Sequence, residues 1–333
     1  MDFTRPIKQV THKKLWCDDN SPSNIDEFIG NTDICKNLYI SSLCTSMLLV
    51  GPHGCGKTTF ARLIVRKMLG ENYNNNLLEL YSSINRNKNY IGNKLLIDNK
   101  NINDFINVSN GGSKLKVIIV YDVDTSTYDS QQIFCELLRE KNVIIIFTCN
   151  SIQGLSDNLL SSVMTINMSS LKYDEINSCL ESIAYKKNMK IMDSVKKAIC
   201  ISCNGDLKKL FNIMQLLSGV CEDRDTEINI DVFYKLIDMP SYECIKELLK
   251  YCEQQNTKKA FEKLNEIIDN GYDNLDILDI IEKTLLYIDI IDSSFDIEKQ
   301  NNMLTVVTQC IVFKKYTKIQ LFNMVYKMCY PIV

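Results

Sequence analysis

A glycine-rich segment from Gly51 to Thr58 carries the clearest chemistry in the sequence. It reads GPHGCGKT and fits the pattern GxxxxGK[ST]. Glycine lets the backbone turn so that successive N–H groups point at phosphate oxygens, and a following helix adds its positive end. Lys57 would reach the β and γ phosphates, and the Thr58 hydroxyl would bind Mg²⁺. We therefore expect ATP or ADP, with Mg²⁺, to be bound by Gly51, Pro52, His53, Gly54, Cys55, Gly56, Lys57, Thr58 and Thr59.

Two acidic residues after an apolar run are candidates for holding the metal. Residues 117–124 read VIIVYDVD and offer Asp122 and Asp124. Phosphoryl transfer needs a carboxylate for Mg²⁺ and a group that orients the attacking water. Which carboxylate faces the metal depends on where the strand ends, so both stay candidates. If Asp122 is the ligand, Val123 occupies the place where a glutamate would activate water.

Asn150 is a third candidate, because it ends the next apolar run in the tripeptide Thr148-Cys149-Asn150. A polar side chain there can touch the γ phosphate or the lytic water. An asparagine after a buried strand is also a frequent turn former. The order of glycine-rich loop, acidic strand and Asn-ended strand favours the catalytic interpretation.

Short apolar runs supply the strands that would position these residues. The run over 46–50 leads directly into the glycine-rich turn, and apolar residues at helical spacing follow over 58–69 and stop at Gly70. This setting argues against a chance glycine-rich turn. Further strands are predicted at 116–121, 143–148 and 163–168, with a helix at 130–140. The alternation predicts an α/β domain with a parallel sheet flanked by helices.

From residue 172 onward the apolar spacing is helical. Helices are predicted over 174–185, 193–203 and 206–217, a loop over 221–229, and a helical block over 240–330. We expect three domains: 1–168 binds nucleotide, 169–235 is a small helical domain, and 236–333 is all-α. The asparagine clusters at 72–76 and 99–110 are expected to be surface loops.

Composition narrows the class of protein. With 333 residues and 45% hydrophobic content, the chain has room for two or three domains. Its net charge of -3 means that any nucleic-acid contact needs a local basic surface. No run of about 18 apolar residues occurs, and residues 1–10 lack a signal-peptide core, so we expect a soluble intracellular protein without membrane contact. The single close cysteine pair, Cys200 and Cys203, favours buried thiols over a zinc site.

The sequence resembles the small subunits of replication factor C and related archaeal clamp loaders. Residues 15–30 read LWCDDNSPSNIDEFIG, and the family reads LWVEKYRPKSLDDLIG in register without a gap. The likeness continues through the glycine-rich loop, the tripeptide 78–80 with Arg86, and the segments 124–132, 148–150 and 204–209. It covers about residues 15 to 217.

This resemblance implies an AAA+ domain, a helical lid over 169–235 and a collar over 236–333 that holds subunits together. Such a chain would be one ATP-binding subunit of a hetero-oligomeric, pentameric ring that helps load a ring-shaped sliding clamp onto primer–template DNA during replication. Ile29, Gly30 and Lys208 would also contact the nucleotide. Arg86 and Lys94 are candidates for the DNA backbone, with solvated surface charge as the alternative. The expected location is the nucleus, or a viral replication compartment if the source is a virus.

The chain also departs from the family at groups that serve hydrolysis. Aligned from 129–132, the family's Asp-Glu-Ala-Asp falls on 121–124, so the metal-binding position holds Tyr121 and the glutamate position holds Asp122. The family's arginine finger falls on Ser162. Other family arginines, with a neighbouring tyrosine, are replaced at Asn20, Ser21, Cys135, Glu136 and Lys208. Lysine lacks the planar fork that grips a phosphate twice.

These departures lead us to expect weak or no hydrolysis by this chain, because an arginine finger can be worth about 10³ to 10⁵ in rate. Two alternatives remain. One is a working DNA-stimulated AAA+ ATPase in which Asp122 or Asp124 holds Mg²⁺. The other is a different AAA+ replication protein, such as a helicase loader or an initiator.

Overall fold

The computed structural model describes residues 15–41, 45–82, 105–106, 115–220, 228–291, 295–313 and 317–330. The chain divides into two compact units. The first comprises Met1–Glu175 with Gly205–Lys209, and the second comprises Ile176–Asn204 with Leu210–Val333. The expected three-domain division at 168 and 236 stays a prediction.

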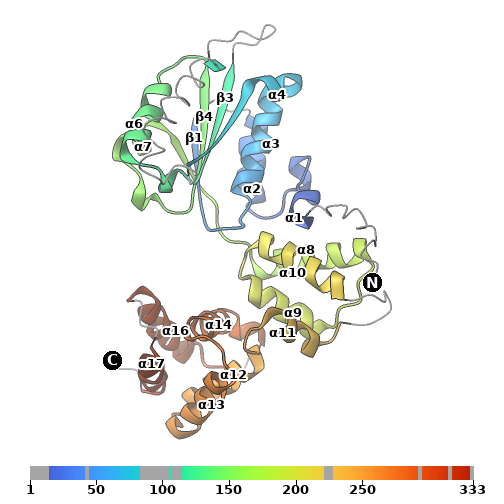
Figure 1. Cartoon of the computed structure of the whole chain (residues 1–333), viewed down its shortest axis with the longest axis vertical. Helices are drawn as coiled ribbons and strands as arrows, with labels where there is room; N and C mark the ends of the chain where they lie inside the picture. The colour runs from blue at the N-terminus through green and yellow to red at the C-terminus, as the bar shows by residue number, and fades with distance from the viewer. Residues whose placement is uncertain are drawn as a thin grey trace, which may run out of the picture. The chain divides into compact units, whose positions relative to one another are not determined.

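A five-stranded parallel sheet organises the first unit (Figure 1). The strand order is β2-β3-β4-β1-β5, and the registered pairs are all parallel. The strands are β1 (Met47–Val50), β2 (Leu77–Tyr81), β3 (Lys116–Tyr121), β4 (Val143–Cys149) and β5 (Met164–Asn167). The order brings the carboxyl ends of β3, β4 and β1 side by side, which is where the candidate residues lie. The predicted α/β fold is confirmed.

Helices cover both faces of this sheet, with α6 and α7 on one side and α2 and α3 on the other (Figure 1). Every residue of β3 and β4 is buried, which explains their continuous apolar runs. The helical elements of this part are α1 (Trp16–Asp19), η1 (Ile25–Glu27), α2 (Thr32–Ser41), α3 (Lys57–Leu69), η2 (Gly70–Asn72), α4 (Tyr73–Asn76), η4 (Val123–Thr125), α6 (Tyr128–Leu137), η5 (Ile152–Gly154) and α7 (Asp157–Ser162).

One expectation for this unit was wrong. Residues 72–76, predicted to be a surface loop, form the end of η2 and the helix α4. Asn76 is fully buried, and its Oδ1 accepts a hydrogen bond of 2.8 Å from the Lys116 ammonium. Asn76 therefore supplies a hydrogen-bond acceptor to the buried ammonium group of Lys116 at the start of β3. This residue has a structural role, so a composition rich in asparagine does not explain its presence.

The second unit is helical, as predicted. Its helices, two of which begin in the first unit, are α8 (Tyr173–Lys187), α9 (Asp193–Cys203), α10 (Leu207–Val220), α11 (Ile230–Ile237), α12 (Tyr242–Glu253), α13 (Thr257–Asp269), α14 (Asn274–Leu286), α15 (Ile288–Ile291), α16 (Ile297–Val312) and α17 (Lys318–Cys329). Helices α12, α13, α14, α16 and α17 share one apolar core. No helix in the part of the chain that is described is long and apolar enough to cross a membrane.

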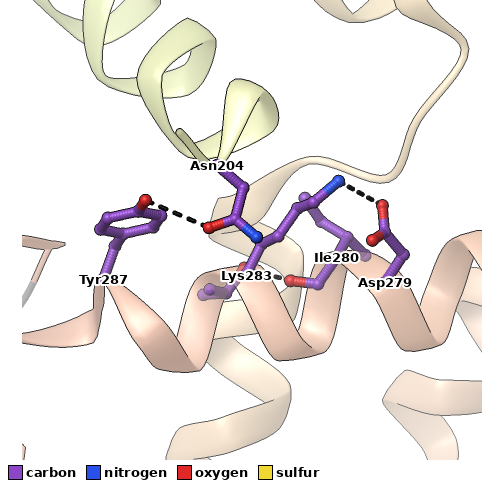
Figure 2. A network of polar contacts seen from close by, with 6 residues as sticks. Asn204, Asp279, Ile280, Lys283 and Tyr287 are labelled. Carbon is purple, nitrogen blue, oxygen red and sulfur yellow. Dashed lines mark hydrogen bonds and ion pairs between the residues drawn. The ribbon is translucent and has the colours of Figure 1, made fainter. Parts of the chain in front are cut away.

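A polar network joins the end of α9 to the end of α14 (Figure 2). Asn204 ends α9 in the left-handed conformation, with φ of 46°, and its Oδ1 accepts a hydrogen bond of 3.2 Å from the Tyr287 hydroxyl. One turn earlier on α14, the buried Lys283 pairs with Asp279. The bond between Tyr287 and Asn204 fastens the end of α9 to α14, and the ion pair lies within α14 itself.

Candidate nucleotide-binding site

The glycine-rich loop lies between β1 and α3, as predicted, and its glycines are needed where they stand. Gly54 and Gly56 have φ of 71° and 95°, a region that disfavours side chains. A Cβ on Gly54 would lie 1.8 Å from Asp206 Oδ1, and one on Gly51 would lie 2.2 Å from the Met168 carbonyl oxygen. The loop is therefore in close contact with two segments far away in the sequence.

Phe28, which precedes the loop in the sequence, also packs against it. A Cβ on Gly56 would lie 2.8 Å from the Phe28 ring, which packs on Phe60 of α3 at 5.7 Å between centroids. Ile29 is half-buried, and Gly30 has φ of 76°. This places the predicted contacts Ile29 and Gly30 directly after a residue that touches the loop.

Asn31 is a site residue that the sequence did not reveal. Its Nδ2 donates to the Ser169 carbonyl oxygen at 2.9 Å, and its Oδ1 accepts from the Ser169 N–H at 3.0 Å. The segment beyond β5 is thereby fastened to the residue that follows the segment 15–30. The partner lies 138 positions away, so no local pattern could have signalled it.

Lys57 is the buried centre of the loop, with 8% of its surface exposed. Its Nζ donates to the carbonyl oxygens of Gly51 and Pro52, both at 2.7 Å, and to Asn150 Oδ1 at 3.0 Å. An ammonium group has three hydrogens to donate, so these acceptors match its full capacity. The structure thus places Lys57 and Asn150, which were predicted as separate site residues, in direct contact.

Asp124 supports Asn150 through the backbone. Its Oδ2 accepts from the N–H groups of Asn150 and Ser151 at 3.1 and 3.3 Å. The other oxygen, Oδ1, is buried and has no hydrogen-bond partner among the residues that the structure describes. Asp124 therefore reaches from η4, just after β3, to the end of β4.

Asp122 follows β3 directly and is half-buried. It has φ of 51°, and its N–H donates to Thr148 Oγ1 at 3.2 Å. The carbonyl oxygen of Asp122 accepts from Ser82 Oγ at 2.9 Å and from Thr125 Oγ1 at 2.8 Å. These bonds fix the backbone and leave the carboxylate for other uses.

The predicted ligands of Mg²⁺ are Thr58 and Asp122. Thr58 is exposed on the first turn of α3. Within the described ranges, no group of three or more His, Cys, Asp or Glu side chains is arranged to hold a metal. Thr58 and Asp122 as Mg²⁺ ligands stay a prediction, since a nucleotide-bound Mg²⁺ draws most ligands from phosphate and water.

Tyr121 ends β3 on the side facing α3. Its ring lies 5.6 Å from the Arg62 guanidinium carbon and 4.7 Å from the Tyr81 ring. Arg62 in turn makes two hydrogen bonds of 3.0 Å to the Glu79 carboxylate. Burial raises the pKa of Tyr121 against the opposing effect of Arg62, so the phenol stays neutral. The family's metal-binding position is thus occupied by a neutral aromatic group.

Asp206 and Lys208 bring the start of α10 to the loop. The Asp206 Oδ1 accepts from the Lys209 N–H at 3.1 Å, and the Leu207 N–H donates to the Gly54 carbonyl oxygen at 3.3 Å. Lys208, which replaces a family arginine and was predicted to contact the nucleotide, is exposed on the first turn of α10. Asp206 lies in the segment 204–209 that resembles the family, but it was not predicted as a contact of the loop.

The remaining predicted positions are Arg86, Lys94, Ser162 and the cysteine pair. Arg86 and Lys94 lie outside the residues that the structure describes. Ser162, at the arginine-finger position, is exposed at the end of α7, and its Oγ donates to the Asn158 carbonyl oxygen at 2.6 Å. Cys200 and Cys203 are buried free thiols on α9. Burial raises the pKa of Cys200 to about 12.

Fold and site together define a P-loop nucleotide-binding protein of the AAA class. Residues 47–170 match the family described as "ATPase family associated with various cellular activities (AAA)". Residues 240–327 match the "Replication factor C C-terminal domain". The two matches fall on the sheet domain and on the C-terminal helical core.

The chain is similar to the replication factor C small subunits over most of its length, as its resemblance implied. It is 27% identical to replication factor C small subunit 2 of Pyrobaculum islandicum, over 83% of this chain and 85% of that protein. It is 25% identical to replication factor C subunit 3 of Saccharomyces cerevisiae, over 84% and 82%. A putative replication factor C small subunit of Acanthamoeba polyphaga mimivirus is also 25% identical, over 81% and 82%.

Solved structures support the fold alone. A point mutant of RuvB from Thermotoga maritima superposes with a TM-score of 0.51 at 15% identity, over 70% of this chain and 79% of that one. A second point mutant of the same protein gives a TM-score of 0.51 at 16% identity, over 69% and 78%.

Proposed function

We propose that this chain is an ATP-binding subunit of a replication factor C-like clamp loader with weak or absent hydrolysis of its own. In that role it helps load a ring-shaped sliding clamp onto primer–template DNA during DNA replication. The observation that carries the proposal is the contrast between a fully formed P-loop around Lys57 and the buried Tyr121 at the end of β3.

Nucleotide binding is supported by the local geometry. Gly54 and Gly56 hold backbone conformations that let N–H groups face a phosphate, and α3 starts at Lys57 with its positive end toward the loop. Lys57, Thr58 and the neighbouring Asn150 would hold the phosphates. Lys208 would add charge from the start of α10.

Weak hydrolysis is supported by two substitutions and by the hydrogen bonds of Asp124. Tyr121 puts a neutral ring where a carboxylate would bind Mg²⁺, and Ser162 offers no arginine to a neighbouring subunit. Asp124 already uses one oxygen on two backbone N–H groups. Thr58 and Asp122 would hold Mg²⁺, whose charge would offset that of the β and γ phosphates.

The assembly is part of the same proposal. The matches to replication factor C subunits and to their C-terminal domain suggest sister subunits in a hetero-oligomeric, pentameric ring, with residues 236–333 as its collar and 169–235 as the lid. Arg86 and Lys94 would contact the DNA backbone inside the ring. The proposed location is the nucleus, or a viral replication compartment.

Co-expression with replication factor C-like sister subunits and the sliding clamp from the same source tests this assembly. We expect one stable complex to be purified and to load the clamp onto primed DNA in the presence of ATP. A Lys57→Ala chain is the matched control, expected to enter the complex but to slow loading. Failure to recover either the sisters or the clamp would count against the proposal and favour another AAA+ replication protein.

The working-ATPase alternative is tested on the purified chain. DNA-stimulated ATP turnover is compared between the wild type and Lys57→Ala. No difference between the two would exclude the enzyme interpretation. A large difference, with turnover of about 1 s⁻¹ or faster, would replace our proposal with an active ATPase.

A further inference from the structure

We propose that Asp124 is a positioning residue that orients Asn150 for the γ phosphate and does not bind the metal. The inference rests on the proposed function, because it assumes that ATP occupies the P-loop. It also assigns different tasks to the two acidic residues after β3.

The Asp124 carboxylate bridges two strands. One oxygen accepts from two successive N–H groups, those of Asn150 and Ser151, at 3.1 and 3.3 Å. Hydrogen bonds from backbone N–H groups to a charged carboxylate are stronger than those to neutral acceptors. The backbone at the end of β4 is therefore held from β3 at the residue that carries the amide.

The Asn150 amide is oriented by this anchor. Its Oδ1 accepts from the Lys57 ammonium at 3.0 Å, which places the amide oxygen toward the cation. The NH₂ group is then the end that can donate to an anion, because an ammonium group cannot accept a hydrogen bond. The Asn150 NH₂ group can thus donate to a γ phosphate, and Lys57 would exchange one of its three present acceptors for a phosphate oxygen to do the same.

The surroundings of Asp124 argue against a metal ligand. Its second oxygen is buried from solvent. Mg²⁺ gives up its water reluctantly and keeps several water molecules when it binds a nucleotide. Both Asp122 and Asp124 are half-buried, but in Asp124 one oxygen is shielded from solvent and the other is bonded to two backbone N–H groups, so neither is free for such a hydrated ion. Asp122 directly follows the strand, and no hydrogen bond of its carboxylate is seen among the described residues.

The test compares ATP and ADP affinities by isothermal titration calorimetry for the wild type, Asp124→Ala and Asp124→Asn. We expect Asp124→Ala to weaken ATP binding about tenfold and ADP binding less than about twofold, the loss of one charge-assisted contact at the γ phosphate. Asp124→Asn keeps an oxygen for the two N–H groups and should stay within about threefold of the wild type. Asp129→Asn, on the exposed start of α6, is the matched control.

A Mg²⁺ titration at fixed ATP separates positioning from coordination. We expect the Mg²⁺ midpoint of Asp124→Ala to equal that of the wild type, and binding that does not depend on Mg²⁺ would also agree. A midpoint raised about tenfold would make Asp124 a metal ligand and overturn the inference. Equal losses for ATP and ADP, or no loss, would overturn it as well. If the wild type binds neither nucleotide, the proposed function itself fails, and the inference fails with it.

Discussion

The Lys57 ammonium nitrogen lies 3.0 Å from the amide oxygen of Asn150, which joins the phosphate-binding loop to the end of β4. The two residues stand 93 positions apart, and the parallel pairing of β1 with β4 brings them together. Asp124 in turn accepts from the Asn150 N–H, so a chain of hydrogen bonds runs from η4, just after β3, through Asn150 to the Lys57 ammonium.

Gly54→Ala should disrupt the loop. The new Cβ would lie 1.8 Å from Asp206 Oδ1 and 2.9 Å from Asp206 Cα, so the start of α10 would have to move. We expect ATP affinity to fall at least about tenfold, because the backbone N–H groups lose their alignment. Calorimetric titration with ATP measures this.

Gly70→Ala is the matched control for that change. Gly70 also has a positive φ, of 51°, but nothing lies within 4 Å of its Cβ position. The variant should lose only about 1 to 3 kcal/mol of stability through backbone strain, and it should keep the wild-type affinity for ATP. Equal affinity losses in both glycine variants would contradict the steric explanation.

Tyr121→Phe should leave ATP turnover and ATP affinity unchanged. The ring would still pack between Arg62 and Tyr81, and the phenol hydroxyl has no metal to bind at this position in our account. Steady-state turnover in the assembled complex is the measurement. A fall of more than about threefold would give the hydroxyl a role in hydrolysis.

The junction of α9 and α14 should contribute measurably to stability. Tyr287→Phe removes the hydrogen bond to Asn204, and we expect it to lower the free energy of unfolding by about 1 kcal/mol. Asn204→Ala should cost more than Asn204→Gly, because alanine also pays for the φ of 46°. Urea unfolding followed by circular dichroism gives the three values, and the reverse order of the Asn204 variants would contradict the conformation.

Buried thiols make stability depend on alkaline pH. Burial raises the pKa of Cys149 from 9.0 to about 12. Above pH 9 the unfolded chain releases this proton while the folded chain keeps it, so the free energy of unfolding falls as pH rises, by up to about 1.4 kcal/mol per unit for each such thiol. Cys149→Ala should flatten this decline in urea unfolding between pH 9 and 10.5. A slope equal to that of the wild type would show that the thiol does not titrate as described.

Much of the fold follows from local patterns. The strand predicted over 116–121 and the helix predicted over 193–203 have the observed bounds of β3 and α9. Buried parallel strands are continuous apolar runs, and helices have a regular spacing, so both can be recognised without knowing their partners. The strand β2 was not predicted, because its half-buried sequence is interrupted by Glu79, whose partner Arg62 comes from another element.

In the candidate site too, the residues of one short motif were predicted, and the contacts between residues far apart in the sequence were not. The loop around Lys57 was predicted because its whole motif lies in eight consecutive residues, 51–58. The contacts of Asn31 with Ser169, of Asp206 with Gly54, and of Asp124 with Asn150 depend on strand order and chain reversal. Such pairs become visible only when the sheet is assembled.

The central claim is that this chain holds ATP more readily than it hydrolyses it. The most direct measurement is to load the purified chain with ATP and Mg²⁺, remove free nucleotide, and identify the nucleotide that remains bound over hours by chromatography after denaturation. We predict about one equivalent per chain, recovered as ATP, and none from Lys57→Ala. Recovery as ADP within minutes, or no bound nucleotide at all, would contradict the account.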